Sequence, residues 1–338
     1  RLIGVIEIVI VFFLIIKILR NFYFQSITYY AAFFAIYLMM NIYLFIPNDY
    51  HTFVNLLTVL SLYFYLEYRN SSNKTISKLV YMLCLVMSLN ALLFVKQNVG
   101  LILSVAIFLI FFVELFRKNY NSLVYYILSY IGLFSVISLL IGLPLDEFLK
   151  ITLQNDSKGN LIDVIFNFLI NEANRRYLYL SIICSLLFLI SKNMKYHEIV
   201  YKIVLFVSLL TIILHIFDHQ SRIIEYMIIG TVAFLWIKLW NLKKSIENYD
   251  LLLIFFSLIY ANSLTADITM IYLFIIAAFF IAEVLTYYKN TLKSNIYKIV
   301  LIFLVSIVFI AHIKDKAKFP YHWWANQSNV KEANYSLP

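Results

Sequence analysis

The sequence has little charge and few of the residues that punctuate soluble folds. Charged residues make up 13% of its 338 residues, and it has only 6 glycines, 4 prolines and 2 cysteines. Soluble domains are about a quarter charged, so this chain cannot cover a water-soluble globule with polar side chains. The low charge excludes a soluble enzyme, a nucleic-acid-binding protein and a disordered chain. The two cysteines, Cys84 and Cys184, lie in apolar runs and exclude a disulfide-rich secreted module.

Apolar residues dominate what remains: 63% of the chain is hydrophobic and the mean hydropathy is +0.86. A membrane-crossing helix needs about 20 mostly apolar residues, so the chain has room for about 12 crossings. We predict an all-α, polytopic membrane helix bundle. The apolar runs lie at residues 2–19, 28–46, 52–66, 79–95, 99–116, 123–143, 177–191, 199–216, 223–240, 250–265, 268–288 and 297–313.

Lysine and arginine in the connections predict the orientation. The connections after odd-numbered spans carry 16 of the 27 cations, two or three in each short connection. The connections after even-numbered spans, together with the C-terminal tail, carry 10, gathered mainly in one long loop and the tail. We therefore predict that the odd connections are cytoplasmic, and that Arg1 and the tail lie outside.

This orientation places the polar segments of the chain on the outer face. The longest is the loop 144–176, in which Asn160 can cap an amphipathic helix lying in the membrane interface over about 160–171. The predicted organisation is a transmembrane bundle over 1–313 and an outer tail over 314–338.

Cations on the outer face are candidates for binding a phosphate group. Arg175 and Arg176 follow the interfacial helix at the outer membrane surface, where a planar guanidinium suits phosphate; the alternative is a pair that anchors the next span. Lys96 and Gln97 form a very short connection between two spans, and the alternative there is an interfacial anchor. Arg222 is a further candidate, although Glu225 stands one turn away and could pair with it.

Acids and histidines supply the remaining candidates. Asp49, in an outer turn after Pro47, is a candidate acid/base or acceptor-positioning residue, unless it only forms the turn. His215, Asp218 and His219 have the spacing of metal ligands on a helix, so a divalent metal ion is a candidate cofactor, and helix-end hydrogen bonding is the alternative. Glu7 is an acid well inside a span and hence a functional candidate.

Several short segments resemble the polytopic GT-C glycosyltransferases, in particular bacterial members of the family 39 and aminoarabinose-transferase type. The best local match is Phe94-Val95-Lys96-Gln97-Asn98-Val99-Gly100-Leu101, which is similar to a lysine-containing turn between two spans of that family. The other similar segments are Arg1-Leu2-Ile3-Gly4, Pro47-Asn48-Asp49-Tyr50, Ala261-Asn262-Ser263-Leu264-Thr265 and the Pro-Tyr-x-Trp-Trp of the tail.

The resemblance implies transfer of a sugar from a polyprenyl-phosphate donor to a lipid or glycan acceptor, at the outer face of a bacterial cytoplasmic (inner) membrane. Membrane lipids and these two substrates are the implied partners, and nucleic acid is not one. Lys96, Arg175 and Arg176 would serve the departing phosphate, and Asp49 the acceptor. The family carries its principal acid in an outer loop after a preceding span. We therefore expect that about 50–80 residues precede Arg1 in the complete protein.

Two other functions fit a protein with many spans. A polysaccharide polymerase or ligase would place histidine and arginine together in its large outer loop, and residues 144–176 contain no histidine. A transporter or flippase commonly breaks helices with Gly and Pro near the middle of the membrane. Here all four prolines, Pro47, Pro144, Pro320 and Pro338, lie in connections or the tail.

Overall fold

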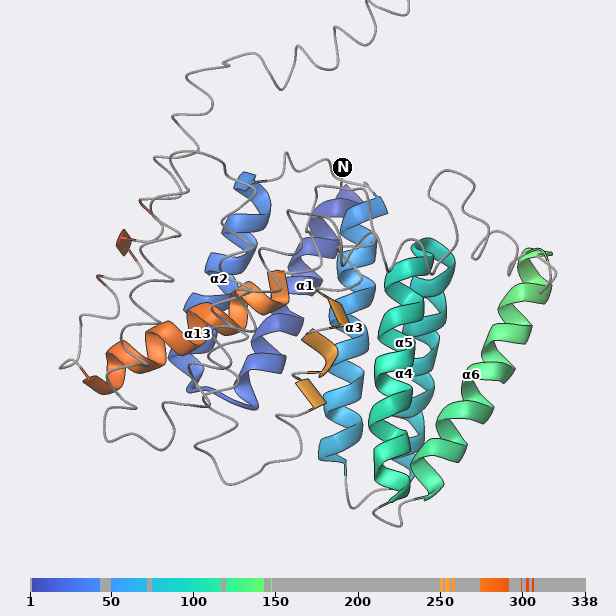
Figure 1. The fold of residues 1–338 in the computed structure, drawn as a ribbon. Coiled ribbons are helices and arrows are strands. Elements are labelled where there is room, and N and C mark those ends of the chain that lie inside the picture. The colour runs from blue at the N-terminus through green and yellow to red at the C-terminus, as the bar shows by residue number, and fades with distance from the viewer. Residues whose placement is uncertain are drawn as a thin grey trace, which may run out of the picture.

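The computed structural model describes residues 2–42, 50–71, 75–116, 120–142, 147, 250–251, 253–255, 257–258, 274–291, 299, 302–303 and 306. Within these ranges every regular element is a helix and none is a strand, which confirms the predicted all-α class for the described part of the chain. The helices are α1 (Leu2–Arg20), α2 (Gln25–Ile42), α3 (Tyr50–Asn70), α4 (Thr75–Val95), α5 (Gln97–Leu115), α6 (Tyr120–Ile141) and α13 (Phe274–Thr291) (Figure 1).

Three of these helices are long and apolar enough to cross a membrane: α4 from Ile76, α5, and α6. The first six predicted spans coincide with α1 to α6, and their boundaries differ by at most four residues. Differences of four residues occur at the end of α2, at the start of α4 and at the end of α3, which was predicted at 66 and is observed at Asn70. This last turn stays helical because Arg69 is held against other helices, as described below.

The helices α1 to α6 run alternately up and down, and α13 crosses the bundle obliquely (Figure 1). Helix α3 packs against both α1 and α4, while α13 packs chiefly against α2. The start of α1 and the turn between α4 and α5 therefore lie at one end of the bundle, which we call the Lys96 end. The ends of α1, α3 and α5 lie at the other, which we call the Arg69 end.

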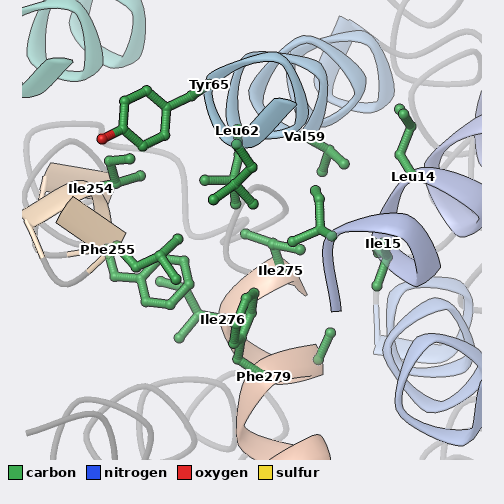
Figure 2. Close-up of a cluster of buried hydrophobic side chains, with 14 of the residues drawn as sticks. Leu14, Ile15, Val59, Leu62, Tyr65, Ile254, Phe255, Ile275, Ile276 and Phe279 are labelled. Atoms are coloured by element: carbon green, nitrogen blue, oxygen red, sulfur yellow. The ribbon is translucent and has the colours of Figure 1, made fainter. Parts of the chain in front are cut away.

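The apolar core forms where α1, α3, α13 and residues 250–258 meet. Leu14 and Ile15 of α1 face Val59 and Leu62 of α3, and Phe255 packs near Phe279 (Figure 2). Residues 275–285 are all buried, because α13 is apolar on every side and Ala277, Ala278 and Ala282 allow neighbours to approach closely.

Most of the described cations gather at the Arg69 end, and several lie over aromatic rings. The Lys17 ammonium is 5.3 Å from the ring centroid of Tyr63. The Lys289 ammonium is 4.2 Å from the ring centroid of Phe24. Arg20, Arg69 and Lys78 make similar contacts with tyrosines. Among the lysine and arginine side chains that the structure describes, Lys96 is the one at the opposite end.

Candidate functional site

The structure describes two of the predicted site residues, Lys96 and Gln97. Asp49, Arg175, Arg176, Arg222 and the predicted metal ligands His215, Asp218 and His219 lie outside the described residues. So do the predicted interfacial helix at 160–171 and the tail at 314–338. In the described ranges, no three His, Cys, Asp or Glu side chains gather as a metal site would require.

Lys96 is the single residue between α4 and α5, so two membrane-length helices reverse direction around it. Its backbone is extended, with φ −142° and ψ 90°. Its N–H donates to the carbonyl of Leu92 (2.8 Å), which completes the last turn of α4. Its carbonyl accepts from the N–H of Gly100 (3.0 Å), which begins α5. Lys96 therefore ends one helix and caps the next.

Gly100 is what allows so tight a reversal. A Cβ atom at this position would lie 2.8 Å from the carbonyl carbon of Leu92 and closer still to the backbone of Leu93. Real Cβ atoms do not approach backbone atoms so closely, so any larger residue would push α5 away from α4. We call residues 96–100 the Lys96 turn. The close approach at Gly100 holds this turn rigidly, and the absence of a side chain there is what lets α4 and α5 pack so closely.

The Lys96 turn concentrates positive charge. The first turn of α5 contains no acid, and the Lys96 side chain makes no capping hydrogen bond to it. The first N–H groups of a helix lack intrahelical partners, and the helix dipole adds about half a positive charge there. Lys96, Gln97 and Asn98 are all half-buried. An ammonium, two amides and a helix N-terminus at the end of the bundle form a suitable environment for a phosphate group.

A second polar cluster, at the Arg69 end, was not predicted. The guanidinium of Arg69 donates from Nε to the hydroxyl of Tyr65 (2.7 Å), from Nη2 to Oδ2 of Asp250 (2.5 Å), and from Nη1 to Glu114. The Tyr65 hydroxyl in turn donates to Asp250. Glu114, Asp250 and Tyr65 are buried, with exposed fractions of 4%, 7% and 0%. We call these four residues the Arg69 cluster.

The Arg69 cluster joins three segments that are far apart in the chain. Arg69 is 45 residues from Glu114 and 181 residues from Asp250. In the sequence, Arg69 is one of the cations that follow an odd-numbered span, and Glu114 lies near the end of an apolar run. The available signal was an acid inside an otherwise apolar run, which needs a partner when it is buried. With its donors and acceptors paired among themselves, the cluster ties α3, α5 and the segment at Asp250 together.

A third buried contact at this end joins the connection between α1 and α2 to α13. The hydroxyl of Tyr23 donates to Oε1 of Glu283 (2.5 Å), and both side chains are buried. The ring of Tyr23 also packs edge-on against Phe279.

Comparison with protein-family models, with curated proteins and with solved structures found no match to this chain.

Proposed function

We propose that this protein is a polytopic membrane glycosyltransferase of the GT-C type. It would move a sugar from a polyprenyl-phosphate donor to a lipid or glycan acceptor at the outer face of a bacterial cytoplasmic membrane. The observation that carries the proposal is the Lys96 turn, a rigid and positively charged reversal at the end of two membrane-length helices.

The chemistry of such a transfer suits this turn. When the bond between sugar and phosphate breaks, negative charge develops on the departing phosphate, and fixed donors aimed at that charge lower the barrier. Lys96, Gln97 and the N-terminus of α5 supply fixed donors at the membrane boundary. A lipid-linked donor also explains why the enzyme would lie within the membrane. Arg175, Arg176 and Arg222 would add cations for the same phosphate, and Asp49 would assist the acceptor.

The proposed topology has about 12 crossings, and the connections after odd-numbered spans lie on the cytoplasmic side. The contacts of Arg69 are consistent with the predicted spans between Glu114 and Asp250, because these two acids meet at one end of the bundle. An even number of crossings must then separate them, and four spans are predicted between these residues. Positively charged residues favour the cytoplasmic side. The gathering of cations at the Arg69 end therefore supports an outer location for the Lys96 turn.

A transporter or flippase for lipid-linked saccharides is the second candidate, and the Arg69 cluster favours it. Ionisable side chains within a helix bundle often mark the path of an ion or a substrate. The transferase is the better-supported function, because the Arg69 cluster ties helices together through its buried contacts, while Lys96, Gln97 and the first N–H groups of α5 lie at the end of the bundle where a phosphate could be bound.

The test is transfer of a labelled sugar from polyprenyl phosphate in proteoliposomes that contain the full-length protein. We expect Lys96→Ala to lower turnover by about 10²-fold, as loss of one fixed donor does at comparable sites. Lys78→Ala is the matched control, because Lys78 lies over the ring of Tyr68 at the opposite end and should leave turnover unchanged.

Three outcomes would decide between the candidates. Normal turnover in the Lys96→Ala protein would remove the phosphate role of Lys96. Movement of the intact lipid-linked sugar across the bilayer, without transfer to an acceptor, would favour the flippase. Loss of turnover in Lys96→Ala with retention in Lys78→Ala would support the transferase.

A further inference from the structure

Two cations from distant parts of the chain are held against the beginning of α2. Arg20 ends α1, and its Nη2 atom donates to the hydroxyl of Tyr29 on α2 (2.6 Å). Lys289, in the last turn of α13, has its ammonium 4.2 Å from the ring centroid of Phe24. The carbonyl of Phe24 accepts from the N–H of Thr28 (3.1 Å), which closes the turn that leads to Tyr29. Arg20 and Lys289 therefore meet the same turn of α2.

The acids of these three helices do not offset the two cations. Helix α2 has no acid, and α13 has one, Glu283, which is buried and accepts from the hydroxyl of Tyr23 at 2.5 Å. The one acid of α1 is Glu7, in the first half of that helix. The side chain of Arg20 is exposed and that of Lys289 is half-buried. The surface at the start of α2 is therefore positively charged and open to a ligand.

Arg20 lies at the depth where membrane-length helices begin. On α3, the hydroxyl of Tyr68 donates to Ser122, close to the start of α6 (2.8 Å). Lys17 of α1 contacts Tyr63 of α3, which runs in the same direction as α1. Three residues further along both helices, Arg20 is only about 3 Å short of the level of Tyr68, at 1.5 Å per residue. This is the depth of the lipid headgroups.

Exposed apolar side chains lead along α1 and α2 to the same turn. Val9 and Phe13 lie on the face of α1 that carries Arg20, and their exposed fractions are 46% and 58%. On α2, Phe33 follows Tyr29 by one turn and has an exposed fraction of 55%. Because Arg20 bonds Tyr29, the two apolar stripes end beside each other at this pair of polar side chains.

We propose that the beginning of α2 is a binding site for one anionic phospholipid of the surrounding membrane. The headgroup phosphate would lie between Arg20 and Lys289, and the acyl chains along the exposed stripes of α1 and α2. A guanidinium binds phosphate through paired N–H groups, and basic sites between membrane helices bind anionic headgroups. The exposed ring of Phe24 suits the membrane boundary, where aromatic residues are enriched.

This lipid site is separate from the Lys96 turn and from sugar transfer. Arg20 and Lys289 are at the Arg69 end of the bundle, whereas Lys96 is at the opposite end (Figure 1). A lipid that bridges the two cations would tie α13 to the connection between α1 and α2, beside the buried contact of Tyr23 with Glu283. The expected consequence of binding is a more stable bundle.

The experiment measures lipid binding to the full-length protein in a neutral detergent by native mass spectrometry. Phosphatidylglycerol is the anionic probe, and phosphatidylcholine with the same acyl chains, which has no net charge, is the comparison. We expect the first phosphatidylglycerol to bind several-fold more tightly than the first phosphatidylcholine. Arg20→Gln and Lys289→Gln should each weaken phosphatidylglycerol binding about fivefold, the usual effect of one basic residue at a membrane surface. The double variant should bind the two lipids equally.

Lys78→Gln is the matched control. Lys78 is a half-buried lysine at the same end of the bundle and, like Lys289, lies over an aromatic ring. It belongs to α4, which packs chiefly against α3, α5 and α6. Its loss should change the affinity by less than about twofold, because charges more than a Debye length away are largely screened. A loss as large as that of Arg20→Gln would show general attraction to surface charge and would overturn the site.

Charge-conserving variants separate charge from structure. Arg20→Lys and Lys289→Arg should retain most of the affinity, and losses equal to those of the glutamine variants would overturn the proposal. Glycerol phosphate, which has the charge but no acyl chains, should not displace the bound lipid. Displacement at equal concentration would identify a site for a soluble anion and would overturn the lipid assignment.

A second measurement uses the wild type alone, so it holds even where a variant fails to fold. A ligand that binds only the folded state stabilises it. Added phosphatidylglycerol should therefore raise the temperature of unfolding, and phosphatidylcholine should not. Equal effects of the two lipids on both the affinity and the unfolding temperature would overturn the site and leave the transferase proposal as it stands.

Discussion

Replacing Arg69 by methionine should destabilise the bundle strongly, because the change leaves two buried acids without their shared partner. Arg69 bonds Glu114, Asp250 and Tyr65 at once, from α3 to α5 and to the segment at residue 250. Removing one partner of a buried ion pair costs about 3–5 kcal/mol. The side chain of Arg69 keeps an exposed fraction of 15%, so some water reaches the site. We therefore expect a loss near the lower value, about 3 kcal/mol in the free energy of unfolding.

Two companion variants test the physical cause. Arg69→Lys keeps the charge but has a single side-chain nitrogen. That nitrogen cannot reach all three acceptors, each of which is bonded by a different nitrogen of the guanidinium. It should give an intermediate loss. The triple variant R69M/E114Q/D250N removes all the charges together, and should recover much of the stability, since the uncompensated charge is the main cost.

The measurement is unfolding in mixed micelles by a denaturing detergent, followed by the helical signal in circular dichroism. The four proteins should rank as wild type, then the triple variant and Arg69→Lys, then Arg69→Met. A stability of Arg69→Met within about 0.5 kcal/mol of the wild type, the usual effect of a surface change, would refute the cluster as an interhelical tie. A triple variant no more stable than Arg69→Met would refute the role of charge.

Three smaller predictions concern the packing of neighbouring helices. Gly100→Ala should cost about 1–3 kcal/mol through overpacking and weaken donor binding, measured by unfolding and by KM. Gly132→Ala, at a position where a Cβ meets nothing within 4 Å, should do neither, and equal effects of the two would contradict the account of the Lys96 turn. Tyr23→Phe removes a hydrogen bond to the carboxylate of Glu283 and should cost about 1.5–3 kcal/mol; an unchanged unfolding midpoint would argue against that contact. Ser61→Ala should cost only about 0.6 kcal/mol, as is typical of hydrogen bonds between helices in membranes, and a loss above about 2 kcal/mol would show that the serine pair matters more than this.

The positions of the helices were predictable because they follow from local composition. A run of about 20 apolar residues is helical in a membrane, since each backbone N–H must find its partner within the segment. The spans predicted at 79–95 and 99–116 accordingly match α4 and α5 closely. The Lys96 turn was predictable for the same reason, because a cation and two amides interrupt two apolar runs.

The partners of Arg69 were not predictable, because they depend on which helix faces meet. Nothing local to Arg69 indicates that Glu114 and Asp250 approach it from 45 and 181 residues away. The sequence shows that Glu114 and Glu283 are acids inside apolar runs, and this alone predicts that each needs a partner. It does not identify the partner.

Arg69 and Lys96 show where these two kinds of information divide. The sequence by itself determined that the described segments are helices, that α4, α5 and α6 are long and apolar enough to cross a membrane, and that Lys96 lies between two of them. Only the tertiary structure decided that Arg69 of α3 meets Glu114 of α5 and Asp250. The reason is physical: helix formation depends on neighbours along the chain, whereas the depth and direction of a side chain depend on how separate helices pack.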